Sequence, residues 1–210
     1  TNKKKYQRLK SELIKNHRLK ILKSGFEKEI IDIQEKLQKN EISFLHSGHL
    51  GDVINALPIL KELSNKRKCN LYLQVGKPLE KHIKGYKHEG DEIYMSEKMV
   101  NMVLPLLKNQ NYINKVEKYN NQLVDVDLNL FRKIPMNFNL DEVRWYFHLT
   151  GIHTDLSKQY LFANEHPSIK NKIVIMRSTR RKNMFINYKF MTKYKDILFL
   201  GLDDEYNDLK

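Results

Sequence analysis

The sequence predicts an α/β protein built on a Rossmann-like parallel sheet. Residues 42–63 indicate a buried strand, a glycine-containing turn and a helix in immediate succession, and an alternating strand follows at 69–75. A strand, a helix and a second strand in this order favour a right-handed crossover between parallel strands. Residues 172–200 repeat the same order later in the chain. We therefore expect the start of a second Rossmann-like unit there.

These patterns divide the chain into three predicted parts. Residues 1–40 form a helical extension, residues 41–160 a Rossmann-like domain, and residues 161–210 the start of the second domain.

Residues 5–37 predict one long helix, or two helices broken at Ser24–Gly25. Apolar residues recur there at steps of three and four, with no proline. Such an apolar stripe needs a partner, either the domain behind it or a second chain. Because the segment precedes the strand–turn–helix unit, we expect an appendage that adds nothing to the crevice of that unit.

The turn after the strand at 42–45 is the first candidate site. Gly48 and Gly51 would let the backbone turn sharply and approach a ligand closely. The free N–H groups at the start of the following helix favour negative charge. Asp52 lies at that helix start, so it is either a cap or a functional carboxylate facing the crevice above the strand.

The next predicted helix begins after Ser96 and includes Pro105, which should kink it or divide it into two pieces. A short strand is expected at 116–117.

Residues 123–130 alternate strictly and predict a strand with Asp125 and Asp127 on one face. Alternating carboxylates could bind a metal, but we expect that they lie on the solvent-exposed face of an edge strand. We therefore expect no metal site.

Asp141 begins a further helix with an aromatic cluster, which ends at Gly151 and is expected to pack in the core or at a domain junction. Residues 154–171 predict a linker to the second unit.

The second unit is expected to contain a strand at 172–176, a cationic turn at 177–182, a helix around 188–194 and a strand at 197–200. A cationic turn after a strand suits phosphate binding.

The net charge of +13 is concentrated in two stretches. Residues 1–40 hold 12 Lys/Arg against 5 Asp/Glu, and residues 165–195 hold 9 against 1. Two basic stretches could contact RNA, a nucleotide or an acidic surface. The alternative is a lysine-rich protein whose solvated faces are basic by default.

The sequence has no apolar run approaching the roughly 20 residues of a membrane span, so we expect a soluble protein. A single cysteine, Cys69, excludes an internal disulfide and a cysteine-based zinc site. The expected location is the cytoplasm or another reducing interior compartment.

The stretch HSGHLGDVINALPILKEL resembles the N-terminal signature of the heptosyltransferase-type glycosyltransferases of family 9, two-domain enzymes with the GT-B fold. The match lies in Leu50–Val53 and Ala56–Pro58. The resemblance implies that Asp52 is the base that activates an acceptor hydroxyl. It also implies an acceptor loop formed by Ser47, Gly48, His49 and Gly51.

The later stretch IVIMRSTRRKN resembles the start of the donor half of such enzymes, where small hydroxyls and basic residues hold a nucleotide diphosphate. The implied donor-phosphate residues are Arg177, Ser178, Thr179, Arg180, Arg181 and Lys182. The resemblance also implies a second domain of over about 100 residues. Either the sequence is a fragment, or the protein is a shortened relative.

Two function hypotheses follow. The first is a metal-independent glycosyltransferase with a nucleotide-sugar as co-substrate, a hydroxyl acceptor and no further cofactor. The second is a non-catalytic basic scaffold of a large assembly, which binds RNA through the basic stretches or associates through residues 5–37. A Rossmann dehydrogenase is disfavoured, because Gly48 and Gly51 do not form a GxGxxG motif.

Overall fold

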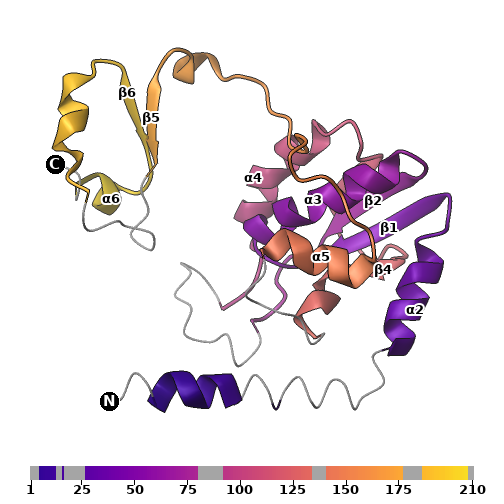
Figure 1. The fold of residues 1–210 in the computed structure, drawn as a ribbon. Helices are drawn as coiled ribbons and strands as arrows, with labels where there is room; N and C mark the ends of the chain where they lie inside the picture. Colours follow the sequence, from indigo (N-terminus) through magenta and orange to yellow (C-terminus); the bar gives the residue numbers. More distant parts are fainter. Residues whose placement is uncertain are drawn as a thin grey trace. The chain divides into compact units, whose positions relative to one another are not determined.

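The structure of the protein is a computed structural model (Figure 1). It describes residues 5–12, 16, 27–79, 92–133, 141–176 and 186–207. The chain forms two compact units, residues 1–162 and residues 163–210.

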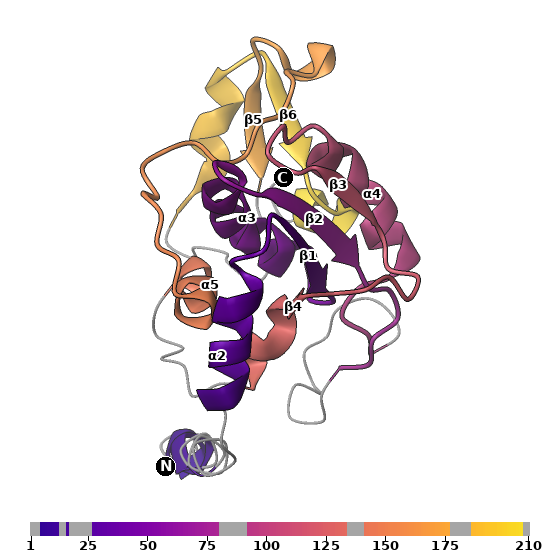
Figure 2. The same cartoon turned by 90° about the vertical axis from the view of Figure 1, so that its right-hand side faces the viewer.

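The first unit contains a four-stranded parallel sheet in the order β3–β2–β1–β4. Figure 2 shows this order from β3 at the top to β4 below. The elements are α2 (Glu27–Lys36), β1 (Glu41–His46), α3 (Leu50–Ser64), β2 (Lys68–Leu73), α4 (Glu97–Lys108), β3 (Lys115–Lys118), β4 (Val126–Asp127), the 3₁₀ helix η1 (Leu128–Arg132) and α5 (Glu142–Thr150). The prediction of an α/β fold with a Rossmann-like parallel sheet is therefore confirmed.

The helices α3, α4 and α5 lie on one face of this sheet. The crossovers β1–α3–β2 and β2–α4–β3 run in the same direction, and right-handed crossovers in one direction place their helices on one side. α5 packs against α3. On this face Phe44 pairs in register with Leu71, and both are fully buried. The core of the first unit thus lies between the sheet and these helices.

The helix α2 belongs to this core. Ile33 and Leu37 are only 2% and 3% exposed, and α2 packs against α5. Of the two partners predicted for the apolar stripe, the domain itself is therefore the one that covers residues 27–37. The predicted break at Ser24–Gly25 lies outside the described residues.

α4 is a single helix, so of the two alternatives predicted at Pro105, a kink or a division, the division is wrong. Ser96 caps it as predicted, accepting a hydrogen bond from the Met99 N–H at 3.3 Å. Pro105 removes one N–H donor, whose acceptor would be the carbonyl of the exposed residue Asn101. The loss of this one hydrogen bond does not end the helix, which continues to Lys108.

The strand predicted at 123–130 is much shorter, because its carboxylates bind the backbone. β4 is an edge strand of two residues beside β1. Asp127 accepts the Asn129 N–H at 2.9 Å and so begins η1. Asp125 accepts the Ser43 N–H at 2.9 Å and the Lys39 ammonium at 2.5 Å. Both carboxylates therefore fasten the sheet edge.

The predicted linker begins later than expected, because side chains of the first unit hold the chain as far as Phe162. The Gln110 amide donates to the Phe162 carbonyl at 2.7 Å and accepts the Phe162 N–H at 2.9 Å. The Tyr112 hydroxyl donates to the Tyr160 carbonyl at 2.5 Å. Residues 159–162 therefore belong to the first unit.

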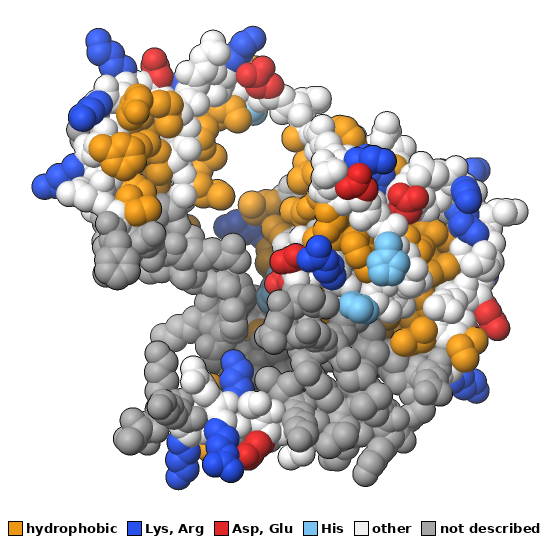
Figure 3. All heavy atoms as spheres, in the orientation of Figure 1, with side chains coloured by type: hydrophobic (Ala, Val, Ile, Leu, Met, Phe, Trp, Pro, Cys, Tyr) orange, Lys and Arg blue, Asp and Glu red, His pale blue; other side chains and the backbone are white. Residues whose placement is uncertain are grey.

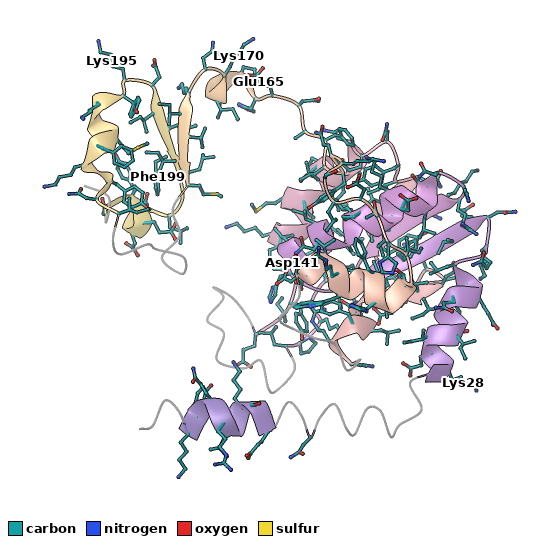
Figure 4. The ribbon with its side chains drawn as sticks, viewed as in Figure 1. Lys28, Asp141, Glu165, Lys170, Lys195 and Phe199 are labelled. Atoms are coloured by element: carbon teal, nitrogen blue, oxygen red, sulfur yellow. The ribbon has the colours of Figure 1, made fainter. Side chains whose placement is uncertain are left out.

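The second unit contains the parallel pair β5 (Ile173–Met176) and β6 (Ile197–Leu200), the 3₁₀ helices η2 (Pro167–Ile169) and η4 (Tyr188–Lys193), and α6 (Asp203–Asn207). The helix predicted around 188–194 is thus a 3₁₀ helix. Figure 4 shows Phe199 between the strand pair and the helical segments, where its ring lies 5.4 Å from that of Tyr206. Many apolar side chains of this unit are exposed (Figure 3).

Candidate active site

The candidate site lies where the strand order of the first sheet reverses. β2 and β3 are on one side of β1, and β4 is on the other. The loop 47–49 follows β1, and η1 follows β4, so both lie at the carboxyl ends of these strands. Open parallel sheets bind their ligands in the crevice at this switch point.

Asp52 is the third residue of α3, at the helix start where the sequence places it. Its Oδ2 accepts the N–H of His49 at 3.0 Å and a hydrogen bond from the Arg132 guanidinium. The Asp52 and Arg132 side chains are 14% and 12% exposed. Among the described residues, none bonds to the second oxygen, Oδ1. One oxygen is thus held in place while the other remains available.

Arg132 is the main site residue that the sequence analysis missed. Its guanidinium lies 4.7 Å from the ring centre of Tyr94 and 4.3 Å from that of Phe131. The ion pair joins residues 80 positions apart in the sequence, and no local pattern could indicate it. The two aromatic rings fix the cation beside Asp52.

Asn129 joins the two loops of the site. Its Oδ1 accepts the Ser47 N–H at 3.0 Å, and its Nδ2 donates to Asp127 at 2.5 Å. Its side chain is buried, so both bonds are shielded from water. The turn after β1 is therefore positioned by the turn after β4.

His46 and Tyr146 form a buried chain of hydrogen bonds below the loop. The Gly48 N–H donates to His46 Nδ1 at 2.9 Å, so the ring proton is assigned to Nε2. His46 Nε2 donates to the Tyr146 hydroxyl at 2.8 Å, and that hydroxyl donates to the Asp52 carbonyl at 2.9 Å. This chain fixes the backbone on both sides of His49.

Burial keeps both rings neutral. It holds the pKa of His46 well below its usual range, and the positive charges of Arg132 and Lys77 lower that pKa further. Burial also raises the pKa of the Tyr146 hydroxyl well above its usual range. A proton on His46 Nδ1 would displace the Gly48 N–H. The loop geometry therefore requires neutral His46.

The stability of the first unit should fall in mild acid because of His46. Unfolded histidine takes up a proton below a pH of about 6.5, whereas the folded ring does not, so the unfolded state binds more protons. This contribution is absent above pH 6.5 and lowers the free energy of unfolding by up to about 1.4 kcal/mol per pH unit below it. Urea unfolding between pH 7.5 and 5 measures the slope.

The free energy of unfolding of the variant His46→Gln should change less steeply with pH over this range. His148→Gln is the control, because His148 is exposed on α5 and should leave the slope unchanged. If the free energy of unfolding depends on pH equally in wild type and in His46→Gln, the assignment of a neutral His46 in the folded protein is contradicted.

The two loop glycines have different environments. A Cβ on Gly48 would lie 2.5 Å from Asp52 Oδ2 and 2.7 Å from His46 Cε1, whereas a Cβ on Gly51 would meet nothing within 4 Å. Gly51 is the second residue of α3, so it lies outside the loop in which the sequence placed it. Of these two positions, only position 48 requires glycine because of close packing.

The remaining predicted residues divide into two groups. Ser47 is buried in the loop, and His49 is the N-cap residue of α3, with its ring 5.5 Å from that of Tyr94. The predicted donor-phosphate residues 177–182 lie outside the described residues.

No protein-family model, curated protein or solved structure shows a match to this chain. Within the described ranges, no three His, Cys, Asp or Glu side chains gather in a metal-binding arrangement. None of the described helices has both the length and the apolar composition that crossing a bilayer requires.

Proposed function

We propose that the protein is a GT-B glycosyltransferase of the heptosyltransferase type, which transfers a sugar from a nucleotide-diphosphate sugar to a hydroxyl acceptor. The main support is the position of Asp52 at the switch point, with Oδ2 held by His49 and Arg132. The resemblance of the surrounding sequence also supports it. Asp52 is the general base of the proposed reaction.

The proposed step uses the free oxygen of this carboxylate. Asp52 Oδ1 takes the proton of the acceptor hydroxyl as the acceptor oxygen bonds to the anomeric carbon of the sugar. The bond from that carbon to the diphosphate breaks, and the diphosphate leaves with the electron pair. Positive charge near the diphosphate stabilises it, and the cationic stretch 177–182 is the candidate for this role.

The variant Asp52→Asn tests this function. It keeps the size of the side chain but removes the base, so sugar transfer should fall by roughly 100-fold or more. A screen of nucleotide-sugar donors against hydroxyl acceptors identifies the substrates first, and kcat/KM is then compared between wild type and variant.

Asp141→Asn is the matched control. Asp141 also lies at a helix start (Figure 4). It also pairs with an arginine, Arg144, but this pair is exposed. Turnover should be unchanged in this variant. Equal turnover of Asp52→Asn and wild type would remove Asp52 from the role of base.

The second candidate is the non-catalytic basic scaffold. It is favoured by the charge distribution: Lys170 and Lys195, in the basic stretch 165–195, are exposed and point away from the second unit (Figure 4). For a scaffold, wild type would transfer no sugar from any donor. RNA binding would weaken with salt, by a log–log slope of roughly −0.7 per phosphate contact on single strands.

A further inference from the structure

A basic concavity lies at the end of α3 opposite to Asp52. It is bordered by the start of β2 and the turn after α4, and its volume is about 420 Å³. Ligand pockets commonly measure about 300–1,000 Å³, so a small molecule fits. The polar side chains lining it are Lys61, Ser64, Asn65, Arg67, Lys68, Asn111, Tyr112 and Asn114.

The charge of this concavity has one sign. Three cations line it, and no Asp or Glu does. Lys61 uses one of its three donors on the Gln159 carbonyl at 2.5 Å, and Arg67 uses one of its five on Gln38 at 2.9 Å. Lys68 is exposed, and its ammonium forms no ion pair with the described residues. The Lys61 ammonium also lies 5.3 Å from the ring centre of Phe162. The Lys68 ammonium and most of the Arg67 donors are thus available to a ligand.

Capping of α3 does not account for these cations. Cations are favoured at helix C-termini, where carbonyl groups lack partners. Here the Lys61 carbonyl accepts the Ser64 hydroxyl at 2.7 Å, and the Leu63 carbonyl accepts the N–H groups of Lys66 and Arg67 at 3.0 Å. The carbonyls of Lys61 and Leu63 are therefore satisfied without the charged groups of Arg67 and Lys68.

We propose that this concavity binds a small phosphate compound with several negative charges, such as a diphosphate. Ammonium and guanidinium groups bind phosphate oxygens with charge-assisted hydrogen bonds, and the amides of Asn111 and Asn114 border the same space. Asp52 and Lys61 are nine helical residues apart, about 14 Å along the axis. The ligand therefore occupies a second site, independent of the proposed sugar transfer.

Titration of the full chain with inorganic pyrophosphate, followed by amide NMR, tests this site. Wild type should show saturable shifts at Ser64, Lys68 and Asn111. Lys68→Ala should weaken binding by about fivefold, the upper range for an exposed charge pair. Inorganic phosphate, with less charge, should bind more weakly than pyrophosphate.

Lys66→Ala is the matched control, because Lys66 has the same charge but lines the neighbouring concavity beside Gly151. It should change the affinity by less than about twofold. Equal losses in both variants, or no saturable shifts at millimolar pyrophosphate, would overturn the proposal. So would a single-stranded oligonucleotide that binds these residues more tightly than pyrophosphate, because the surface would then serve nucleic acid.

Discussion

Arg132→Ala is expected to lower the free energy of unfolding by about 3 kcal/mol or more, the usual result of breaking a largely buried ion pair. The Asp52 carboxylate, which is 14% exposed, would lose the cation that compensates it. The contacts of the guanidinium with Tyr94 and Phe131 would be lost as well. Urea unfolding at neutral pH measures the difference.

Arg144→Ala provides the comparison. The Arg144 and Asp141 side chains are 48% and 72% exposed, so this variant should lose no more than about 1 kcal/mol. If the free energy of unfolding falls by the same small amount in both variants, the Arg132 ion pair does not stabilise the site.

Gly48→Ala is expected to destabilise the first unit by about 1–3 kcal/mol, as overpacking of a filled interior does. The new methyl group would lie within 2.8 Å of atoms of Asp52, His46 and Arg132. These three side chains hold one another or the loop, so none can move alone. The catalytic carboxylate proposed above should be displaced, and sugar transfer should fall together with stability.

Gly51→Ala separates this steric effect from the loss of glycine itself. Its new methyl group would have open space, and alanine is favoured over glycine within a helix by up to about 1 kcal/mol. We therefore expect unchanged or slightly higher stability. Destabilisation of Gly51→Ala as large as that of Gly48→Ala would show that the crowding at Gly48 is not the cause.

The β1–α3–β2 unit could be predicted because its signals are local. Apolar residues with the strand period and then the helix period define the buried faces of residues 42–63, and a right-handed crossover allows one topology. The alternation at 123–130 was misleading, because Asp127 binds the backbone of Asn129 and ends the strand. Hydrophobic period alone does not reveal such competition.

The site could be predicted only in part for a related reason. The position of Asp52 could be predicted, because a helix start after a glycine turn is a local feature. Arg132 and Asn129 approach the loop only after β4 has paired with β1. The neutral state of His46 depends on burial under α5, and a sequence does not show burial of a single polar side chain.

The side-chain amide of Gln110 pairs with the backbone of Phe162 as a neighbouring strand would. It donates one hydrogen bond to the Phe162 carbonyl and accepts one from the Phe162 N–H. It thereby sets the residue at which the backbone leaves the first unit. Insertions or deletions beyond Phe162 would leave both bonds intact, and each doubling of a flexible connection costs only about 0.6 kcal/mol. The segment that connects the two units can therefore change in length during evolution without changing the structure of either unit.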